Sequence, residues 1–209
     1  MTATGEWVPI RPVGPAPPHG KPPSGRTPAW WGMVLFITTE ATIFACLLGS
    51  YFYIRFSTAG PWPPGGIKDP ELSKPLIMTV LLLSSSGPMV WADLAVRRGR
   101  TAQLRAGLAF TLALGAAFLG LQATEYATKL GEFVWSTNVY GSLFYVITGF
   151  HGLHVIVGLV MLVFVTIAAL AGKLGSRHHE RVRLVAFYRH FVDAVWITIL
   201  FTIYLSPHL

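Results

Sequence analysis

Five long apolar segments divide the sequence. Each holds about 20 residues or more with few charges, the length that a helix needs to cross the hydrocarbon layer of a membrane. The segments lack the period-two alternation of strands, and only helices or closed barrels satisfy their backbone polar groups in lipid. The pattern predicts an all-α, polytopic membrane bundle of five transmembrane helices at about residues 30–54, 75–96, 106–126, 139–171 and 184–206.

The first 28 residues differ from the rest of the chain. They hold eight of its 15 prolines and no apolar run. Such a composition cannot bury a core, so residues 1–28 are expected to form a flexible, partly polyproline arm. The lack of an apolar stretch in the arm argues against a cleaved signal peptide. Residues 29–209 are then expected to form one five-helix domain.

Basic residues gather on one side of the predicted bundle. Eleven lysines and arginines precede the first helix or lie in the loops after helices two and four, against four on the opposite side. By the positive-inside rule, this asymmetry predicts a cytoplasmic N-terminus and an external C-terminus. The same rule accounts for the net charge of +7, so the charge does not indicate binding to nucleic acid.

Composition narrows the possible chemistry. Only 12% of the residues are charged and the mean hydropathy is +0.54, whereas about a quarter of residues are charged in a soluble domain. Cys46 is the single cysteine, so neither an internal disulfide nor a cysteine-pair metal site can form. The sequence contains no phosphate-binding loop, nucleophile elbow or dinucleotide fingerprint.

An acid lies near the middle of the first predicted helix. Glu40 follows Trp30 by ten residues, about 15 Å along a helix, and no lysine or arginine lies within a turn of it. A charged side chain at that depth costs about 2.5–3.5 kcal/mol on the insertion scale and needs a specific role. Two interpretations stay open. Glu40 could exchange protons or face lipid, or it could be a buried glutamate that ties helices together by a hydrogen bond.

Histidines and an aspartate recur in the last two helices. His151 and His154 are three residues apart in the fourth helix, and His190 and Asp193 have the same spacing in the fifth, so each pair shares a helix face. With Glu40 they could supply ligands for a di-iron bundle. Such sites usually need about four carboxylates and Glu-x-x-His motifs, which are absent here. Packing and hydrogen bonding between helices is the favoured interpretation.

Two further acids lie close to predicted helix ends. Glu125, near the external end of the third helix, is expected to be interfacial and to cap or pair with loop groups. Asp93, near the cytoplasmic end of the second helix, has Arg97 four residues later, which predicts a local ion pair. In the same helix, Gly87 and Pro88 predict a break.

Five stretches form a series along these helices. They are TTEATIFACLLGSYFY, LLLSSSGPMVWA, LQATEY, VYGSLFYVITGFHGLHVIVG and YRHFVDAVW. In order and spacing the series resembles subunit III of cytochrome c oxidase, from about residue 30 to the C-terminus. The resemblance is to the short, five-helix bacterial form, which lacks the two extra N-terminal helices of longer members.

The resemblance implies a role in aerobic respiration. Haem–copper oxidases reduce oxygen to water and pump protons, and their haem and copper lie in subunits I and II rather than in subunit III. The resemblance therefore implies no cofactor in this chain, a main contact with subunit I, contact with subunit II and further respiratory subunits, and support of proton uptake and turnover. It also implies phospholipid in a cleft between the first two helices and the other three, in the bacterial plasma membrane.

The same resemblance implies roles for individual residues. Glu40 takes the place of the family's intramembrane carboxylate that reacts with carbodiimide. Two residues depart from the family, because Arg189 stands where it usually has tryptophan and Asp93 where many members have histidine. Arg189 and Trp91 are candidate lipid contacts. The two histidines of the fourth helix are expected to pack and hydrogen-bond inside the bundle.

Alternatives remain at two levels. The electron donor is open, because quinol oxidases and a relative associated with nitric oxide reductase have a similar subunit. A stand-alone proton-coupled transporter that uses Glu40, or an intramembrane metal-dependent oxidase that acts alone, would belong to other classes. Transporters often show internal repeats and broken mid-membrane helices, whereas this sequence shows no repeat.

Overall fold

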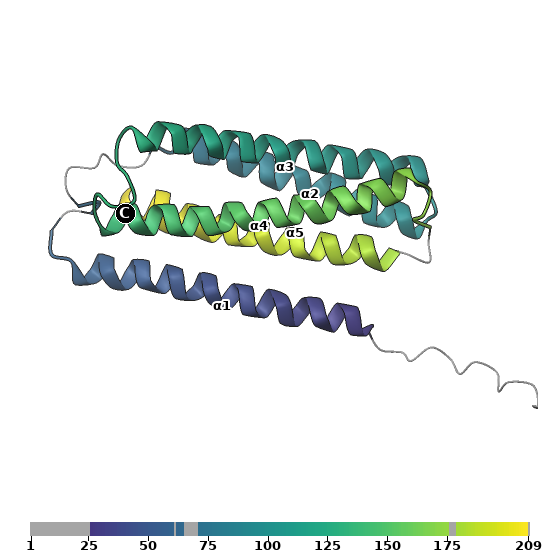
Figure 1. The fold of residues 1–209 in the computed structure, drawn as a ribbon, viewed down its shortest axis with the longest axis horizontal. Helices are drawn as coiled ribbons and strands as arrows, with labels where there is room; N and C mark the ends of the chain where they lie inside the picture. Colours follow the sequence, from purple (N-terminus) through teal and green to yellow (C-terminus); the bar gives the residue numbers. More distant parts are fainter. Residues whose placement is uncertain (1–25, 61, 65–70, 176–178, 209) are drawn as a thin grey trace, which may run out of the picture.

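The computed structural model describes residues 26–60, 62–64, 71–175 and 179–208. In these residues all regular structure is helical, and five helices are long and apolar enough to cross a membrane, as the sequence predicts (Figure 1). Most of the predicted proline-rich arm, residues 1–25, lies outside the described residues. In chain order the helices are α1 (Pro28–Ser57), α2 (Ser73–Arg97), α3 (Thr101–Leu130), α4 (Val139–Leu170) and α5 (His179–Ile199).

Polar side chains start two of the helices. The hydroxyl of Thr27 accepts a hydrogen bond from the backbone of Trp30 at 3.3 Å, and a proline follows at the first position of α1. The side chain of Asn138 accepts one from the backbone of Gly141 at 2.8 Å, at the start of α4. Both contacts satisfy backbone donors that have no partner inside the helix.

Four helices form the bundle and α1 lies beside it. The most extensive contact joins α2 and α3, and α4 and α5 complete the bundle, while α1 packs on α4 and α5 (Figure 1). The resemblance placed a lipid cleft between the first two helices and the other three. The structure corrects this division, because α2 packs on α3 and α5 and has little contact with α1.

A glycine allows the close approach of α2 and α3. A Cβ atom added at Gly107 would lie 2.7 Å from the carbonyl oxygen of Pro88 and 3.0 Å from the Cβ of Ala92. The predicted break at Gly87 and Pro88 was wrong, because α2 continues through both residues. Packing against α3 stabilises the helix across a proline that lacks a backbone donor.

The outward faces of the bundle are apolar. On α1 only Phe44 and Tyr51 are buried, while Leu35 is 68% exposed. On α4, Phe164 is 69% exposed although the same helix buries residues along most of its length. Extended apolar faces of this kind mark contact with lipid or with other membrane helices.

The ends of α1 and α5 are joined by an arginine. Beyond Ile199 the chain continues through a π-helical segment, η2 (Leu200–Leu205), and a short 3-10 segment, η3 (Ser206–His208). Arg55 donates to the Ser206 hydroxyl at 2.5 Å and to its carbonyl oxygen at 2.7 Å. This contact fixes one end of α1, which has few other polar links to the bundle.

Candidate functional site

Glu40 and His154 form the central polar contact between α1 and α4. Glu40 Oε2 lies 2.8 Å from His154 Nε2, and the two side chains are 18% and 9% exposed. The other ring nitrogen, Nδ1, lies 2.7 Å from the carbonyl oxygen of Phe150, and Phe44 packs edge-on against the imidazole. The pair lies within two membrane-spanning helices, where unpaired polar groups are costly.

The surroundings of His154 restrict where its protons can be. A carbonyl oxygen only accepts hydrogen bonds, so Nδ1 carries a proton and donates it to Phe150. Nε2 then faces Glu40 in one of two states. Either a protonated Glu40 donates to a neutral imidazole, or a protonated imidazole donates to the carboxylate. One proton joins the two side chains in both states, and the pair carries no net charge.

This contact bears on the two sequence interpretations of Glu40. The side chain reaches a histidine on another helix, which is the geometry of a glutamate that ties helices together. It also keeps a partly exposed edge, because α1 packs mainly on α4 and α5 and lies at the side of the bundle. Glu40 therefore shares a proton with His154 and also lies at the outer edge of the bundle, so both interpretations stay open.

Arg189 lies inside the bundle, which corrects its interpretation as a lipid contact. It is 3% exposed and donates a short hydrogen bond to the hydroxyl of Ser85 on α2. Asp193, one turn later, lies 3.9 Å from the guanidinium and accepts a 2.6 Å hydrogen bond from Ser86. A Cβ at Gly115 would lie 2.9 Å from the arginine, so this glycine leaves the space that the guanidinium fills.

His190 lies at the edge of this buried group. Its side chain is 43% exposed and its Nδ1 is 3.9 Å from Asp193. The i, i+3 spacing therefore brings the two side chains near each other, as the helix geometry predicts. The contact is longer than a hydrogen bond, so it is electrostatic rather than directional.

His151 is fully buried and packs among aromatic rings. Its imidazole lies 5.1 Å from the ring of Trp196 and 5.9 Å from that of Phe118, measured between centroids. Neither ring nitrogen has a hydrogen-bond partner among the described side chains and backbone. The expected packing is present, whereas the expected hydrogen bonding is made by His154 and not by His151.

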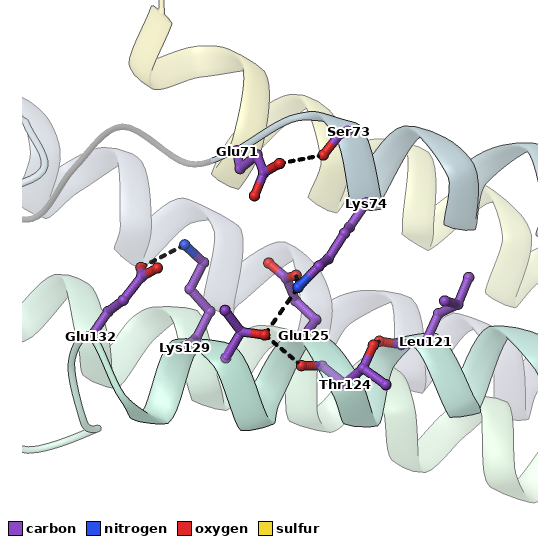
Figure 2. Close-up of polar contacts among 9 residues, drawn as sticks. Glu71, Ser73, Lys74, Leu121, Thr124, Glu125, Lys129 and Glu132 are labelled. Atoms are coloured by element: carbon purple, nitrogen blue, oxygen red, sulfur yellow. Dashed lines mark hydrogen bonds and ion pairs between the residues drawn. The ribbon is translucent and has the colours of Figure 1, made fainter.

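A second polar cluster lies between α2 and α3, near the start of α2 and the end of α3 (Figure 2). Glu125 is 4% exposed, and its Oε2 atom lies 3.5 Å from the ammonium of Lys74. Lys74 also donates to Thr128, and Lys129 pairs with Glu132 at 2.7 Å. Glu125 is therefore buried within the chain and pairs with Lys74 near the start of α2, as expected for an acid that pairs close to a helix end.

Two remaining sequence candidates lie near the end of α2. Asp93 pairs with Arg97 at 2.6 Å, as its spacing predicts. Trp91 is 42% exposed on the outer surface, where a lipid or another subunit could contact it. In the residues that the structure describes, no three histidine, cysteine, aspartate or glutamate side chains lie close enough to hold a metal ion.

These contacts define a helical bundle with polar pairs in its interior. Comparison with known proteins shows the family to which the chain belongs. The sequence pattern of the family described as cytochrome c oxidase subunit III matches residues 25–207, which include all five helices. The chain belongs to the cytochrome c oxidase subunit III family. Membership makes it a subunit III of a haem–copper oxidase.

Curated relatives agree with the family match. The cytochrome c oxidase subunit 3 of Drosophila yakuba is 37% identical over 179 residues, which cover 83% of this chain and 68% of that protein. The subunit 3 of Pylaiella littoralis is 38% identical over 178 residues, 83% of this chain and 65% of that protein. The subunit 3 of Pan troglodytes is 38% identical over 179 residues, with coverages of 83% and 68%.

Sequence reasoning missed several partners of the site. Ser85 and Ser86 hold Arg189 and Asp193, and Thr79 accepts a 2.9 Å hydrogen bond from the indole of Trp196. A signal was available, because three consecutive serines in an apolar helix are unusual and offer hydroxyls to a neighbour. Pairing them with α5 requires the tertiary arrangement, because more than 100 residues separate the partners.

Proposed function

We propose that this chain is the accessory, non-redox subunit of a proton-pumping haem–copper oxidase. Subunit I would be its main contact and would hold haem and copper together with subunit II. Family membership supports the assembly. The polar contacts are consistent with a subunit that holds no redox centre, because Glu40, Arg189 and Glu125 each contact a polar side chain of another helix.

The Glu40–His154 pair is the observation on which this proposal mainly depends. It fastens the outlying helix α1 to the bundle inside the membrane, through a carboxyl that holds a shared proton. An outlying helix fixed in this way offers a stable apolar face to phospholipid and to subunit I. Through that face the subunit would sustain proton uptake and turnover in subunit I.

The location follows from the same arrangement. Cationic residues concentrate at one end of the bundle, where α1 and α5 begin and α2 ends. By the positive-inside rule, this distribution supports a cytoplasmic position for that end and an external position for the other, and we propose the bacterial plasma membrane as the location. Phospholipid would be the ligand bound by this chain itself.

Purification of the tagged chain in a mild detergent tests the assignment. The expected result is a complex with an absorption spectrum of haem and a large many-helix partner. Subunit II of the copurified complex would distinguish a cytochrome c oxidase from a quinol oxidase or a nitric-oxide-reductase relative. A stable, colourless chain without partners would contradict the proposal and would favour a proton-coupled transporter that uses Glu40.

A further inference from the structure

A groove lies where α1, α2 and α5 meet at the cation-rich end of the bundle. Its volume is about 250 Å³. Arg26 precedes α1, Asp93 belongs to the last turns of α2, and Arg183 and His190 belong to α5. From Arg183 to His190 the groove follows α5 for about 10 Å, so it extends from the helix ends into the depth of the membrane.

The groove has two cationic groups that its own carboxylate does not neutralise. Neither Arg26 nor Arg183 pairs with a carboxylate of the described part of the chain. Asp93 lines the groove but pairs with Arg97 outside it. Guanidinium groups bind phosphate oxygens strongly, since their fixed donors form charge-assisted hydrogen bonds.

The walls of the groove are aromatic at the level of the helix ends. The guanidinium of Arg26 stands 3.7 Å above the ring of Trp30, and that ring stacks on Phe187 of α5 at 6.3 Å between centroids. Tryptophan near the end of a membrane helix marks the boundary between head groups and hydrocarbon. A molecule in this groove would therefore have a polar part beside the arginines and an apolar part along the helices.

One oxygen atom of the Asp93 carboxylate lacks a hydrogen-bond donor in the described part of the chain. Its Oδ2 atom accepts from Arg97, while its Oδ1 atom is buried and has no hydrogen-bond partner among the described atoms. A buried acceptor without a partner is unfavourable, because it has lost its hydrogen bonds to water. The terminal torsion of an aspartate is soft, so the carboxylate can turn Oδ1 toward a donor in the groove while Arg97 stays near.

We propose that this groove binds one phospholipid whose head group is phosphoethanolamine. Arg26 and Arg183 would bind the phosphodiester, the primary ammonium would donate to Asp93, and the acyl chains would follow α2 and α5 toward His190. The site differs from the cleft implied by the resemblance, because it lies between α1, α2 and α5 and uses the aspartate in which this chain departs from the family. It depends on the membrane placement of the helices and not on the oxidase assignment.

Native mass spectrometry of the full chain in detergent tests the head-group preference. Dioleoyl phosphatidylethanolamine is expected to be retained about tenfold more tightly than the phosphatidylcholine with the same chains, because a choline has no donor for Asp93. Asp93→Ala should reduce this preference to about twofold or less. Arg97→Ala is the matched control, because it breaks the same ion pair but leaves the carboxylate, so it should keep the preference.

The arginines are tested with the same probes. Arg183→Gln should weaken binding of both lipids about tenfold, whereas Arg181→Gln, which removes an exposed charge outside the groove, should change it by about twofold or less. Arg26→Gln serves as a second variant, because this exposed residue precedes the first helix and lies outside the packed interior of the bundle.

Four results would overturn the proposal. They are equal retention of the two lipids by the unmodified chain, tighter retention of phosphatidylglycerol than of phosphatidylethanolamine, an Arg181→Gln effect as large as that of Arg183→Gln, and displacement of the lipid by an equal concentration of inorganic phosphate. The last would indicate a site for free phosphate. Copurification of haem is unaffected by these outcomes, so the two proposals fail separately.

Discussion

His154 holds Glu40 through a single proton, with 2.8 Å between Nε2 and Oε2, across 114 positions of the sequence. The carbonyl of Phe150 fixes the orientation of the imidazole from the other side. The mid-membrane acid of α1 and one of the two histidines of α4 therefore act as one unit.

Carbodiimide labelling should distinguish Glu40 from the buried Glu125. An apolar carbodiimide dissolves in the membrane and can reach Glu40, whose side chain is 18% exposed, but not Glu125, whose side chain is 5% exposed. Peptide mass spectrometry is expected to find the adduct on Glu40 and none after Glu40→Gln, with assembly largely intact. Glu125→Gln is the control and should leave labelling unchanged. Labelling that persists in Glu40→Gln would contradict the assignment.

The contribution of the Glu40–His154 pair can be measured with a double-mutant cycle. His154→Leu leaves the carboxyl of Glu40 without its partner and should lower the free energy of unfolding by about 1–3 kcal/mol. Glu40→Leu with His154→Leu removes both polar groups and should lower it by less than the sum of the single changes. Thermal unfolding in detergent gives these values, and additive effects would show that the two side chains do not interact.

Arg189 and Asp193 should behave as a buried pair. Arg189→Leu leaves Asp193 with Ser86 and the partly exposed His190 and should cost about 3 kcal/mol of stability, because the buried guanidinium no longer compensates the carboxylate. The double change Arg189→Leu with Asp193→Leu should lower the free energy of unfolding by less than the sum of the two single changes. A lipid contact, by contrast, would make Arg189→Leu nearly silent in detergent-purified protein.

His151 is expected to tolerate an apolar replacement. Its ring is fully buried between Trp196 and Phe118, and its nitrogens have no partner in the described residues. Replacing such a group with a side chain of similar volume can be neutral or stabilising. His151→Leu should therefore change the unfolding temperature little and leave the haem content of the copurified complex intact. A large loss of stability would reveal a buried partner such as water.

Two glycines of α3 give opposite predictions. At Gly107 a new Cβ would meet the backbone oxygen of Pro88 at 2.7 Å, so Gly107→Ala must push α2 and α3 apart, at about 1–3 kcal/mol. At Gly120 nothing lies within 4 Å, and Gly120→Ala should add about 0.5–1 kcal/mol of stability through helix propensity. Thermal unfolding of the two variants checks the pair, and equal effects would argue against the close contact.

The sequence predicted the number, type and approximate bounds of the helices, because hydropathy and length report directly on membrane spans. It also predicted the Asp93–Arg97 pair, which is local. It misplaced Arg189, because the space for a guanidinium depends on Gly115 of another helix. It did not identify Lys74 as the partner of Glu125 for a similar reason, since Lys74 lies far along the chain. Tertiary pairing of polar groups is not encoded in spacing along one helix.

The outlying position of α1 has a consequence for biogenesis. The ribosome makes α1 before α4 and α5, and its polar partners His154 and Ser206 are made 114 and 151 residues after Glu40 and Arg55. During that interval α1 waits in lipid without them. The hydroxyls of Thr38, Thr42 and Ser50 need no other helix in this interval, because they donate hydrogen bonds to backbone carbonyls of α1 itself. Glu40 stays unmatched in the middle of α1 until α4 is made, and Arg55 at its end waits for Ser206, so α1 is fixed in two steps.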